Sequence, residues 1–500
     1  MTDTNEHSFC GARHRRPSSQ KERGIGMAND DSPTDDSPTD DYDLIVIGAG
    51  PAGEVLAGRC AEAGLRVAIV ERELVGGECS YWGCMPSKVL LRPGDVLAAA
   101  ARVPGAAAAI TGRADAAATF ALRDRFTSNW DDTGSVPWLT DRGITVVRGT
   151  GRLAGERTVE VEHGDGCRAT LTAARAVAVA TGTAAAIPPI PGLAEASPWT
   201  NRDVTAAKEV PGRLIVVGGG AIGLEMAQAF HRLGRGEVTV IEAAPAILAR
   251  EEPFAGAEVQ AALAAEGIEI LVGIGVSSVA RRGDGPVAVV LANGCRIEAD
   301  EILVAAGRRP ATSDLGLETV GLEPGRSIVV DDQLLAVGVD GGWLFAVGDC
   351  NGRALLTHMG KYQARVAADV ILGRPAAATS DHSAVPRVTF TDPQVCAVGF
   401  TEAGAREAGI TVRVVSYATG GVAGAAVLGR EFPGTSQLVI DQDRRVVVGA
   451  TFVGPGVQEL LHSATVAIAG EVTLDRLWHA VPSFPTVSEV WLRLLEAYGL

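Results

Sequence analysis

The chain has 500 residues, of which 47% are hydrophobic, and this is enough for about three domains with separate cores. Its formal net charge is −16, and no basic block offsets that field, which argues against nucleic acid or anionic lipid as the main partner. No apolar run reaches the roughly 18 residues that span a bilayer, and the N-terminus lacks the apolar core of a signal peptide. We therefore expect a cytoplasmic protein. Its eight cysteines are too dilute for a disulfide-stapled secreted domain.

Residues 1–41 form a polar segment without apolar periodicity, in which Asp-Ser-Pro-Thr-Asp occurs twice, at 31–35 and 36–40. This composition predicts a disordered tail. Met27 lies inside the segment, so N-terminal sequencing is needed to decide whether the first 26 residues are translated.

The pattern that follows predicts a βαβ unit, with a strand over 44–47, a helix over about 52–63 and a strand over 67–70. The turn after the first strand carries Gly48, Gly50 and Gly53, and Glu71 ends the second strand 18 residues after Gly53. The first glycine permits the tight turn, the second lets a pyrophosphate reach the helix N-terminus, and the third allows close packing of helix on strand. The unit predicts a dinucleotide site in which Glu71 accepts hydrogen bonds from ribose hydroxyls.

Residues 76–88 place two cysteines five positions apart, in the order Gly-Gly-Glu-Cys79-Ser-Tyr-Trp-Gly-Cys84-Met-Pro-Ser-Lys88, before an apolar helical stretch. Cysteines this close can bridge where the backbone is irregular, and a helix N-terminus stabilises a thiolate. No second Cys or His pair lies nearby to complete a metal site, so we expect no metal. Two buried structural thiols are the other alternative. The segment favours a redox-active pair.

A second βαβ unit is predicted from a strand over 214–217, a helix over about 221–233 and a strand over 238–241. Its glycines are Gly218, Gly220 and Gly223, and Glu242 ends the second strand. A carboxylate at this position hydrogen-bonds a free 2′-hydroxyl and repels a 2′-phosphate, which favours NAD(H) over NADP(H). The alternative is that Glu242 is a solvated acid at a strand end.

After about residue 380 the pattern changes to strands over 387–390, 437–440 and 446–453, followed by two helices. This predicts a separate α+β domain.

The cysteine segment resembles the active-site segment of the class I pyridine nucleotide-disulfide oxidoreductases, which include dihydrolipoamide dehydrogenase, glutathione reductase and mercuric reductase. The order of motifs over about 42–500 is similar as well: the first glycine turn, the cysteine pair, Ala180-Thr181-Gly182, the second glycine turn, Ala305-Ala306-Gly307-Arg308-Arg309-Pro310 and Gly348-Asp349. The resemblance implies an α/β fold with two Rossmann-like domains, for FAD and NAD(H), and a C-terminal α+β dimerisation domain of a homodimer.

With the element pattern, the resemblance predicts a division of the chain into five segments: a tail at 1–41, an FAD-binding domain with the redox cysteines at 42–200, an NAD-binding domain at 201–315, a second FAD-contacting central segment at 316–378, and a dimerisation domain at 379–500.

The resemblance also implies a role for each matching residue. Cys84 lies against the flavin as the charge-transfer thiol, Cys79 faces the substrate as the interchange thiol, and Lys88 pairs with Glu225 near the flavin. Asp349 binds the ribitol of FAD, and the other cofactor-binding residues of these motifs are Thr181, Gly182, Gly307 and Gly348. From the sequence alone, Asp349 after a strand over 343–347 also fits a helix N-cap, and Lys88 also fits an exposed helix lysine. Lys88 is, however, one of only four lysines among 44 basic residues.

The chain departs from the family near its C-terminus. Members that reduce disulfides use a His-Pro and a following glutamate as acid/base in the partner subunit, whereas this chain keeps Pro485 and Glu489 but has Phe484 at the histidine position. A phenyl ring neither protonates a thiolate nor stabilises one, and loss of such a base typically costs ~10²–10⁴-fold in rate. His479 is the nearest alternative imidazole, and Glu489 also fits a capping box that begins at Thr486. The C-terminal cysteine pair of mercuric reductases is missing as well, which argues against a mercury specialist.

We therefore predict an FAD-dependent enzyme that passes electrons from NADH to a Cys79–Cys84 disulfide and on to a small-molecule acceptor that needs little proton delivery, such as a quinone, a metal ion or an unusual disulfide. The alternative enzyme is a dihydrolipoamide dehydrogenase in which another group replaces the missing base. A redox sensor that holds FAD but cycles slowly is the alternative outside enzymology.

Overall fold

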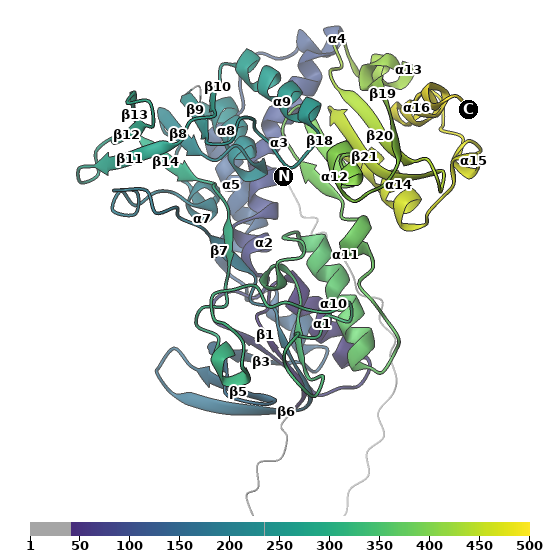
Figure 1. Cartoon of the computed structure of the whole chain (residues 1–500). Coiled ribbons are helices and arrows are strands. Elements are labelled where there is room, and N and C mark those ends of the chain that lie inside the picture. The colour runs from purple at the N-terminus through teal and green to yellow at the C-terminus, as the bar shows by residue number, and fades with distance from the viewer. Residues whose placement is uncertain (1–41, 235) are drawn as a thin grey trace, which may run out of the picture. The chain divides into compact units, whose positions relative to one another are not determined.

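The structure is a computed structural model that describes residues 42–234 and 236–500 (Figure 1). The predicted disordered tail and Met27 lie outside the described residues. Within them, no helix is long and apolar enough to cross a membrane.

The first sheet is built around β1 (Tyr42–Ile47), which is the apolar strand predicted at 44–47. Its strands run in the order β3-β2-β1-β6-β5-β4, with β16 also pairing with β6. β1 lies parallel to β2 and β6, and the side chains of Leu44, Ile45 and Val46 are fully buried. The bounds are β2 (Val67–Glu71), β3 (Thr145–Arg148), β4 (Thr150–Leu153), β5 (Thr158–Glu162), β6 (Arg168–Val179) and β16 (Leu344–Ala346). Helices α1 (Pro51–Glu62) and α10 (Thr357–Ile371) pack against each other beside this sheet (Figure 1).

The second sheet is a four-stranded parallel sheet in the order β10-β9-β8-β14, again with a glycine turn after its central strand. Its strands are β8 (Arg213–Val217), β9 (Glu237–Glu242), β10 (Glu269–Val272) and β14 (Glu301–Val304), with helices α8 (Ala221–Gly234) and α9 (Pro253–Glu266). An antiparallel sheet of β11 (Val276–Arg281), β12 (Val287–Leu291) and β13 (Arg296–Ala299) is inserted before β14 and was not predicted. The ribbon of β7 (Thr183–Ala185) and β15 (Arg308–Pro310) joins residues that follow the first and second sheets.

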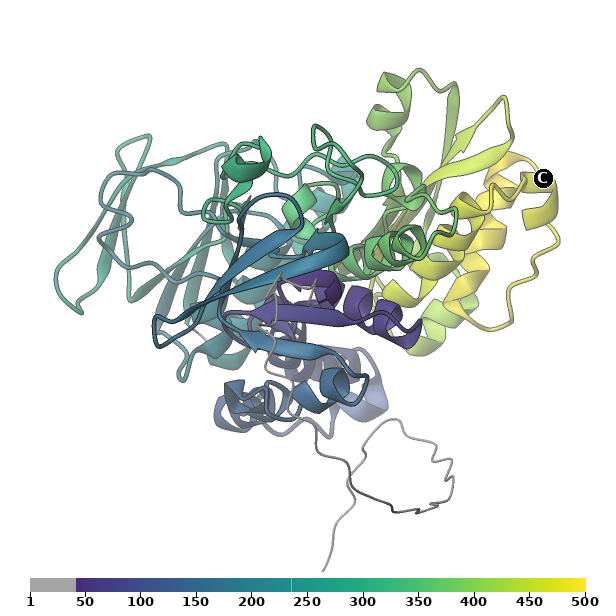
Figure 2. The same ribbon diagram turned by 90° about the horizontal axis from the view of Figure 1, so that it is seen from below.

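The C-terminal part is the α+β unit that the sequence predicted, with an antiparallel sheet in the order β17-β18-β21-β20-β19, of which β18 and β19 were not predicted. The strands are β17 (Arg387–Thr389), β18 (Gln394–Gly399), β19 (Val412–Ala418), β20 (Thr435–Asp441) and β21 (Val446–Gly454), and the two later helices are α14 (Gln458–Ala469) and α16 (Val490–Tyr498). Figure 2 shows these helices in yellow beside the strands of their sheet.

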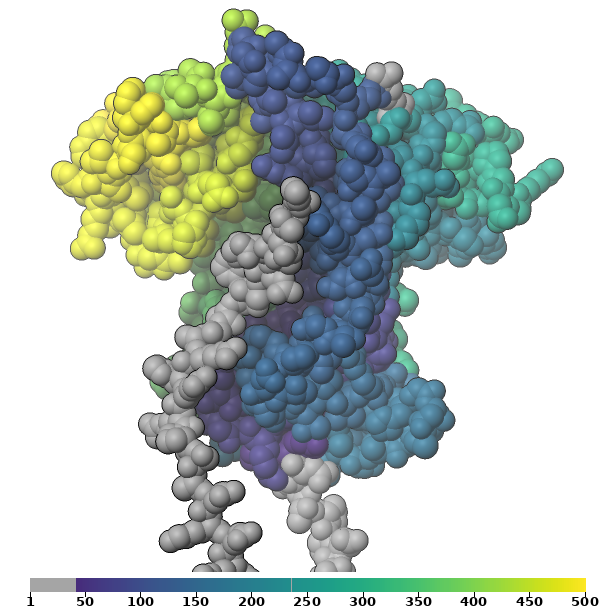
Figure 3. Space-filling model, turned by 180° about the vertical axis from the view of Figure 1, so that it is seen from behind, coloured from purple at the N-terminus to yellow at the C-terminus, as the bar shows by residue number. Residues whose placement is uncertain are grey.

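Helices between these sheets supply the rest of the fold. The helices that carry or contact the cysteine segment are α2 (Gly77–Tyr81), α3 (Cys84–Ala101), α5 (Ala116–Phe126) and α7 (Asn201–Ala206). Short helices are α4 (Pro104–Ala107), α6 (Val136–Thr140), α11 (Ser380–Ser383), α12 (Glu402–Glu407), α13 (Ala423–Leu428) and α15 (Leu474–Leu477), and the 3₁₀ turns are η1 (Ser128–Trp130), η2 (Leu317–Val320), η3 (Asp349–Asn351), η4 (Thr419–Gly421) and η5 (Val487–Glu489). From behind, the segment that begins with α3 lies in blue between the C-terminal part in yellow and the second sheet's unit in teal (Figure 3).

The predicted fold class is confirmed, because two nucleotide-binding βαβ units and a C-terminal α+β unit are all present. The predicted strand over 343–347 is shorter than expected and covers only Leu344–Ala346. The residue boundaries of the five predicted segments stay a prediction.

Candidate active site

The first glycine turn is packed so tightly that side chains are excluded at two of its three glycines. Gly48 has a φ of +105°, and a Cβ there would meet the Ala180 carbonyl oxygen at 2.5 Å. A Cβ at Gly53 would meet the Gly48 carbonyl oxygen at 2.0 Å, whereas one at Gly50 would meet open space. Gly50 therefore presents bare backbone to a cavity of about 430 Å³, as a pyrophosphate site requires.

The second glycine turn repeats this arrangement. A Cβ at Gly218 would meet the Ala305 carbonyl oxygen at 2.5 Å, and one at Gly223 would meet the Gly218 carbonyl oxygen at 2.1 Å, while Gly220 again faces open space. Both turns therefore have the backbone geometry of a dinucleotide cradle.

The acid that ends each second strand is tied back to its own glycine turn. Glu71 accepts a hydrogen bond from the Ala49 amide at 2.8 Å, and Glu242 accepts one from the Gly219 amide at 2.6 Å. Burial raises the pKa of Glu71, while hydrogen bonds from the Ala49 and Glu73 amides oppose the rise. Glu242 is therefore part of the turn's own hydrogen bonding, which disfavours the simple solvated-acid alternative. Each carboxylate oxygen keeps lone pairs for further donors.

The cysteines come together because α2 ends and α3 begins between them. Cys84 is the first residue of α3, and its Sγ lies 3.3 Å from Oγ1 of Thr357, the first residue of α10. Both cysteines are free thiols here, in hydrogen-bonding contact with each other. That contact, the Thr357 hydroxyl and the charge of Lys88 lower the pKa of Cys84 to about 6 against the effect of burial. The hydrogen bond to Cys84 and burial raise the pKa of Cys79.

Lys88 lies one helical turn after Cys84 on α3 and forms an ion pair with a buried carboxylate. Its Nζ is 2.7 Å from Glu225 Oε2, and the Glu225 side chain is only 5% exposed. The second Glu225 oxygen accepts from the Phe390 amide, and the Lys88 ammonium lies 4.6 Å from the Phe390 ring centroid. The pair that the resemblance implied is present, and Lys88 is not a freely exposed helix lysine.

The cavity beside the first glycine turn fits FAD by the polar groups that line it. The Thr181 hydroxyl is buried without a hydrogen-bond partner in the described part of the chain. Asp349 lines the same cavity, and burial raises the pKa of its carboxyl group. Asp349 is the first residue of η3, not its N-cap, and accepts from the Thr183 hydroxyl at 2.8 Å, so the N-cap alternative is wrong. An unpartnered hydroxyl and a buried carboxylate are the groups that a polyhydroxylated chain such as ribitol would satisfy.

The remaining predicted glycines also lie near this cavity. Gly182 and Gly348 line it, and both have positive φ, at +70° and +77°. Gly307 has a φ of +141° and precedes β15, and its carbonyl accepts from the Ala186 amide.

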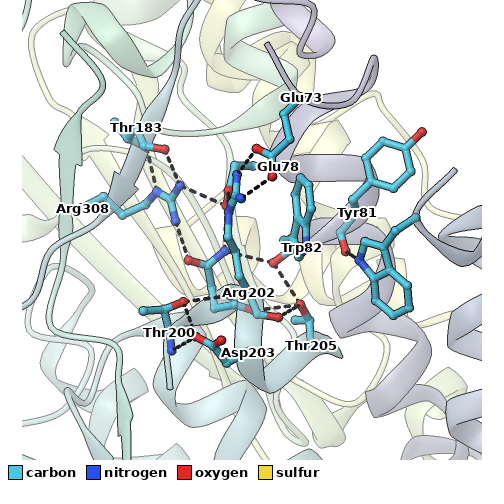
Figure 4. A network of polar contacts seen from close by, with 12 residues as sticks. Glu73, Glu78, Tyr81, Trp82, Thr183, Thr200, Arg202, Asp203, Thr205 and Arg308 are labelled. Atoms are coloured by element: carbon cyan, nitrogen blue, oxygen red, sulfur yellow. Dashed lines mark hydrogen bonds and ion pairs between the residues drawn. The ribbon is translucent and has the colours of Figure 1, made fainter. Parts of the chain in front are cut away.

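A polar network missed from the sequence lies on one wall of the cavity (Figure 4). Arg202 of α7 contacts Glu73 at 2.8 Å and also pairs with Glu78, which precedes Cys79, and its guanidinium lies 4.0 Å from the Trp82 ring centroid. Arg308 donates to both oxygens of Thr183 and approaches Glu78 at 3.4 Å. The network ties the cysteine segment to α7 and β15. Arg202 lies more than 120 residues from Glu73 and Glu78 in the sequence, so no local sequence pattern predicted these pairs.

The C-terminal residues contradict one of the sequence alternatives, the capping box at Thr486. Phe484 is 76% exposed, and His479 is also exposed. The capping box is wrong, since the Thr486 side chain makes no capping bond and instead donates to the Ser483 carbonyl. Glu489 is buried and pairs with Arg493. No contact between Glu489 and the cysteines is found in the described residues.

Comparison with known proteins agrees with this geometry. The pyridine nucleotide-disulphide oxidoreductase family matches residues 42–368, and its dimerisation domain matches residues 385–494. The chain belongs to this family. It is an FAD-dependent oxidoreductase that uses NAD(P)H, and the redox-sensor alternative is set aside.

Relatives with different acceptors are similar to the chain at nearly the same level. A dihydrolipoyl dehydrogenase of Chlamydia muridarum is 33% identical, in an alignment that covers 90% of this chain and 95% of that protein. A mercuric reductase of Staphylococcus aureus is 30% identical, in an alignment that covers 90% of this chain and 81% of that protein. The Cu(II) complex of the HOCl-induced flavoprotein disulfide reductase RclA from Escherichia coli has a TM-score of 0.80 at 25% identity, covering 92% of this chain and 99% of RclA. Similarity alone does not select the acceptor.

Proposed function

We propose that this enzyme is a homodimeric, NADH-preferring reductase that uses Cys79 and Cys84 to reduce a small-molecule acceptor without the family's histidine base. Two observations together support the proposal. The pKa of Cys84 is lowered, which favours its thiolate, and the residue at the family's histidine position, Phe484, is an exposed phenyl ring. Location in the cytoplasm stays a prediction.

FAD, when bound in the cavity, would supply the two-electron relay between nicotinamide and the cysteines. Gly48, Gly50 and Gly53 would hold its pyrophosphate, and Glu71 and Asp349 would accept from its hydroxyl groups. Cys84, held as a thiolate by Thr357 and Lys88, would be the thiol nearest the flavin. Cys79 would then be the thiol that meets the acceptor.

The nicotinamide cofactor would bind at the second glycine turn. Glu242 there would accept from a free 2′-hydroxyl and repel a 2′-phosphate. Titration of the purified enzyme with each reduced nucleotide tests this assignment. A lower KM for NADPH than for NADH would contradict it.

The homodimer is supported by the dimerisation-domain match. In such a dimer, the exposed loop that carries Val481 and Phe484 is available to the partner subunit. A phenyl ring supplied there excludes water but moves no proton.

An acceptor screen with NADH tests the proposed function directly. Wild type, Cys79→Ser and Phe484→His are compared on quinones, metal ions, disulfides and lipoamide. We expect Cys79→Ser to lose turnover and Phe484→His to gain disulfide reductase activity. Efficient NAD-dependent oxidation of dihydrolipoamide by the wild type would instead favour a dihydrolipoamide dehydrogenase, and full turnover by Cys79→Ser would refute the use of the cysteine pair.

A further inference from the structure

The ion pair of Lys88 and Glu225 is completed by a turn of the C-terminal unit. Residues 390–392 lie between β17 and β18, inside the range 385–494 that matches the dimerisation domain. The Phe390 amide donates to Glu225 Oε1 at 2.9 Å, and the centroid of the Phe390 ring lies 4.6 Å from the Lys88 ammonium. Because the Glu225 side chain is buried, each of its oxygens needs a donor, and Phe390 supplies one while Lys88 supplies the other. The position of this turn therefore determines where the ammonium is held.

The turn is itself held by a buried glutamine of α8, the helix that packs along α3 (Figure 1). Gln228 is fully buried and lies three residues after Glu225, so the two side chains share one side of α8. Its side chain forms two hydrogen bonds with the main chain of Asp392: Oε1 accepts from the amide at 2.8 Å, and Nε2 donates to the carbonyl at 3.0 Å. An amide side chain carries an acceptor and a donor side by side, which a carboxylate or a thioether does not. Gln228 therefore fixes the main chain of the turn that carries Phe390.

The charged groups of this region bind the same turn in a different way. Arg102 of α3 and Arg232 of α8 both pair with the Asp392 carboxylate, and Arg232 also pairs with Glu266 of α9 at 2.6 Å and with Asp95 of α3 at 3.4 Å. Two side-chain torsions separate that carboxylate from its own main chain. These pairs therefore anchor the turn between the helices without fixing the orientation of its amides, as Gln228 does.

We propose that Gln228 is a positioning residue for the redox thiols: through the main chain of residues 390–392 it holds Glu225, and through Glu225 it holds the Lys88 ammonium on the face of α3 that carries Cys84. The inference rests on the role of Cys84 in the proposed function. Lys88 lies four residues after Cys84, and its charge lowers the pKa of that thiol. Without the Gln228 bonds, the Phe390 amide shifts, the buried Glu225 carboxylate follows it, and the ammonium is displaced.

A role in packing alone would have a different consequence. Loss of the Gln228 side chain would then leave the amide and carbonyl of Asp392 without partners and would lower only the melting temperature. A positioning role also changes the titration of Cys84, and this change depends on the ammonium of Lys88. Two substitutions that act through one group are not additive, so a double-mutant cycle separates the two roles.

The test follows the pH titration of Cys84 in two-electron-reduced holoenzyme, through the long-wavelength charge-transfer absorbance. Wild type, Gln228→Met, Lys88→Met and the double variant are compared. Gln228→Met should move the midpoint to higher pH, by no more than Lys88→Met does, because a displaced ammonium stabilises the thiolate less. The double variant should titrate like Lys88→Met, since no ammonium is left to displace. A wild-type midpoint in Gln228→Met, or full additivity in the double variant, would overturn the inference.

Two further variants keep the test decisive if Gln228→Met is poorly folded. Phe390→Leu keeps the main-chain amide but removes the ring beside the ammonium, and it too should raise the midpoint in a way that Lys88→Met abolishes. Gln437→Met is the matched control, because Gln437 is a buried glutamine of β20 that bonds to Ser416. It should lower the melting temperature and leave the midpoint of Cys84 unchanged. A shift in Gln437→Met as large as that in Gln228→Met would overturn the inference.

A second measurement reports the thiolate without the flavin band. Reduced holoenzyme is treated with iodoacetamide as a function of pH, and alkylation of Cys84 is located by mass spectrometry; the order of midpoints should be the same. The failure of the proposed function has a different signature, because the charge-transfer band would then persist in Cys84→Ser. The present inference fails when the band depends on Cys84 and Gln228→Met titrates as wild type.

Discussion

Replacement of Thr357 by valine should raise the pKa of Cys84 by about one unit. The Thr357 hydroxyl lies 3.3 Å from Cys84 Sγ, and it contributes to the lowering of that pKa to about 6. A hydrogen bond to a charged group contributes about 1.5–3 kcal/mol, and one pKa unit corresponds to about 1.4 kcal/mol. Because sulfur is a weaker hydrogen-bond acceptor than oxygen, the lower end applies, and the pKa should move to roughly 7.

The assay follows the thiolate in two-electron-reduced enzyme, through its long-wavelength charge-transfer absorbance, as a function of pH. The absorbance should be present above the pKa and lost as the pH falls through it. In Thr357→Val the loss should begin at higher pH, while Thr357→Ser, which keeps the hydroxyl, should titrate as wild type. An unchanged midpoint in Thr357→Val would refute the assignment of Thr357 as a thiolate donor, and retention of the band in Cys84→Ser would refute the assignment of the thiolate itself.

Three further substitutions test the surroundings of the pair. Gly53→Ala should weaken FAD binding by roughly 10- to 100-fold, because its Cβ would lie 2.0 Å from a backbone oxygen; the flavin-to-protein absorbance ratio measures this. Lys88→Met should raise the pKa of Cys84 less than Thr357→Val does, since the charge of Lys88 ranks below the hydroxyl among the causes, and the same pH titration measures it. Arg202→Met should release FAD at a lower temperature, because two acidic side chains of the cavity wall lose their cation; flavin fluorescence during heating measures this.

Each of the three substitutions Gly53→Ala, Lys88→Met and Arg202→Met has a control variant of the same residue type at a site without the contact in question. Gly105→Ala adds a Cβ that meets nothing within 4 Å, so flavin content should not change. Lys208→Met removes a lysine that pairs with Asp124 at the surface, so the Cys84 titration should stay as in wild type. Arg296→Met breaks an exposed pair with Glu298 and should leave flavin release unchanged. A full flavin complement in Gly53→Ala, an unshifted pKa in Lys88→Met, or unchanged flavin release in Arg202→Met would contradict the respective reasoning.

The sequence was sufficient for the parts of the fold that repeat a local pattern. Both glycine turns carry their geometry in adjacent residues, since Gly53 and Gly223 each face the carbonyl of a glycine five residues earlier. The acid that ends the next strand is likewise at a fixed spacing, and Glu71 and Glu242 bind their turns in the same way. Local spacing therefore determines these sites.

Contacts between distant segments could not be predicted in the same way. Thr357 lies 273 residues from Cys84, and Arg202 lies 129 residues from Glu73, so nothing in either neighbourhood shows the pairing. Lys88 and Glu225 were paired only through the resemblance. The predicted capping box is absent because the Thr486 hydroxyl donates to the Ser483 carbonyl instead. A four-residue sequence pattern does not show which of these local hydrogen bonds forms.

Glu489, which follows Phe484 in the C-terminal segment, is already paired within its own subunit. One Glu489 oxygen pairs with Arg493 four residues later, while the other is buried without a partner in the described part of the chain. A carboxylate that is already paired with a residue of its own helix does not replace the missing imidazole, so Glu489 alone does not restore the proton carrier that Phe484 removes.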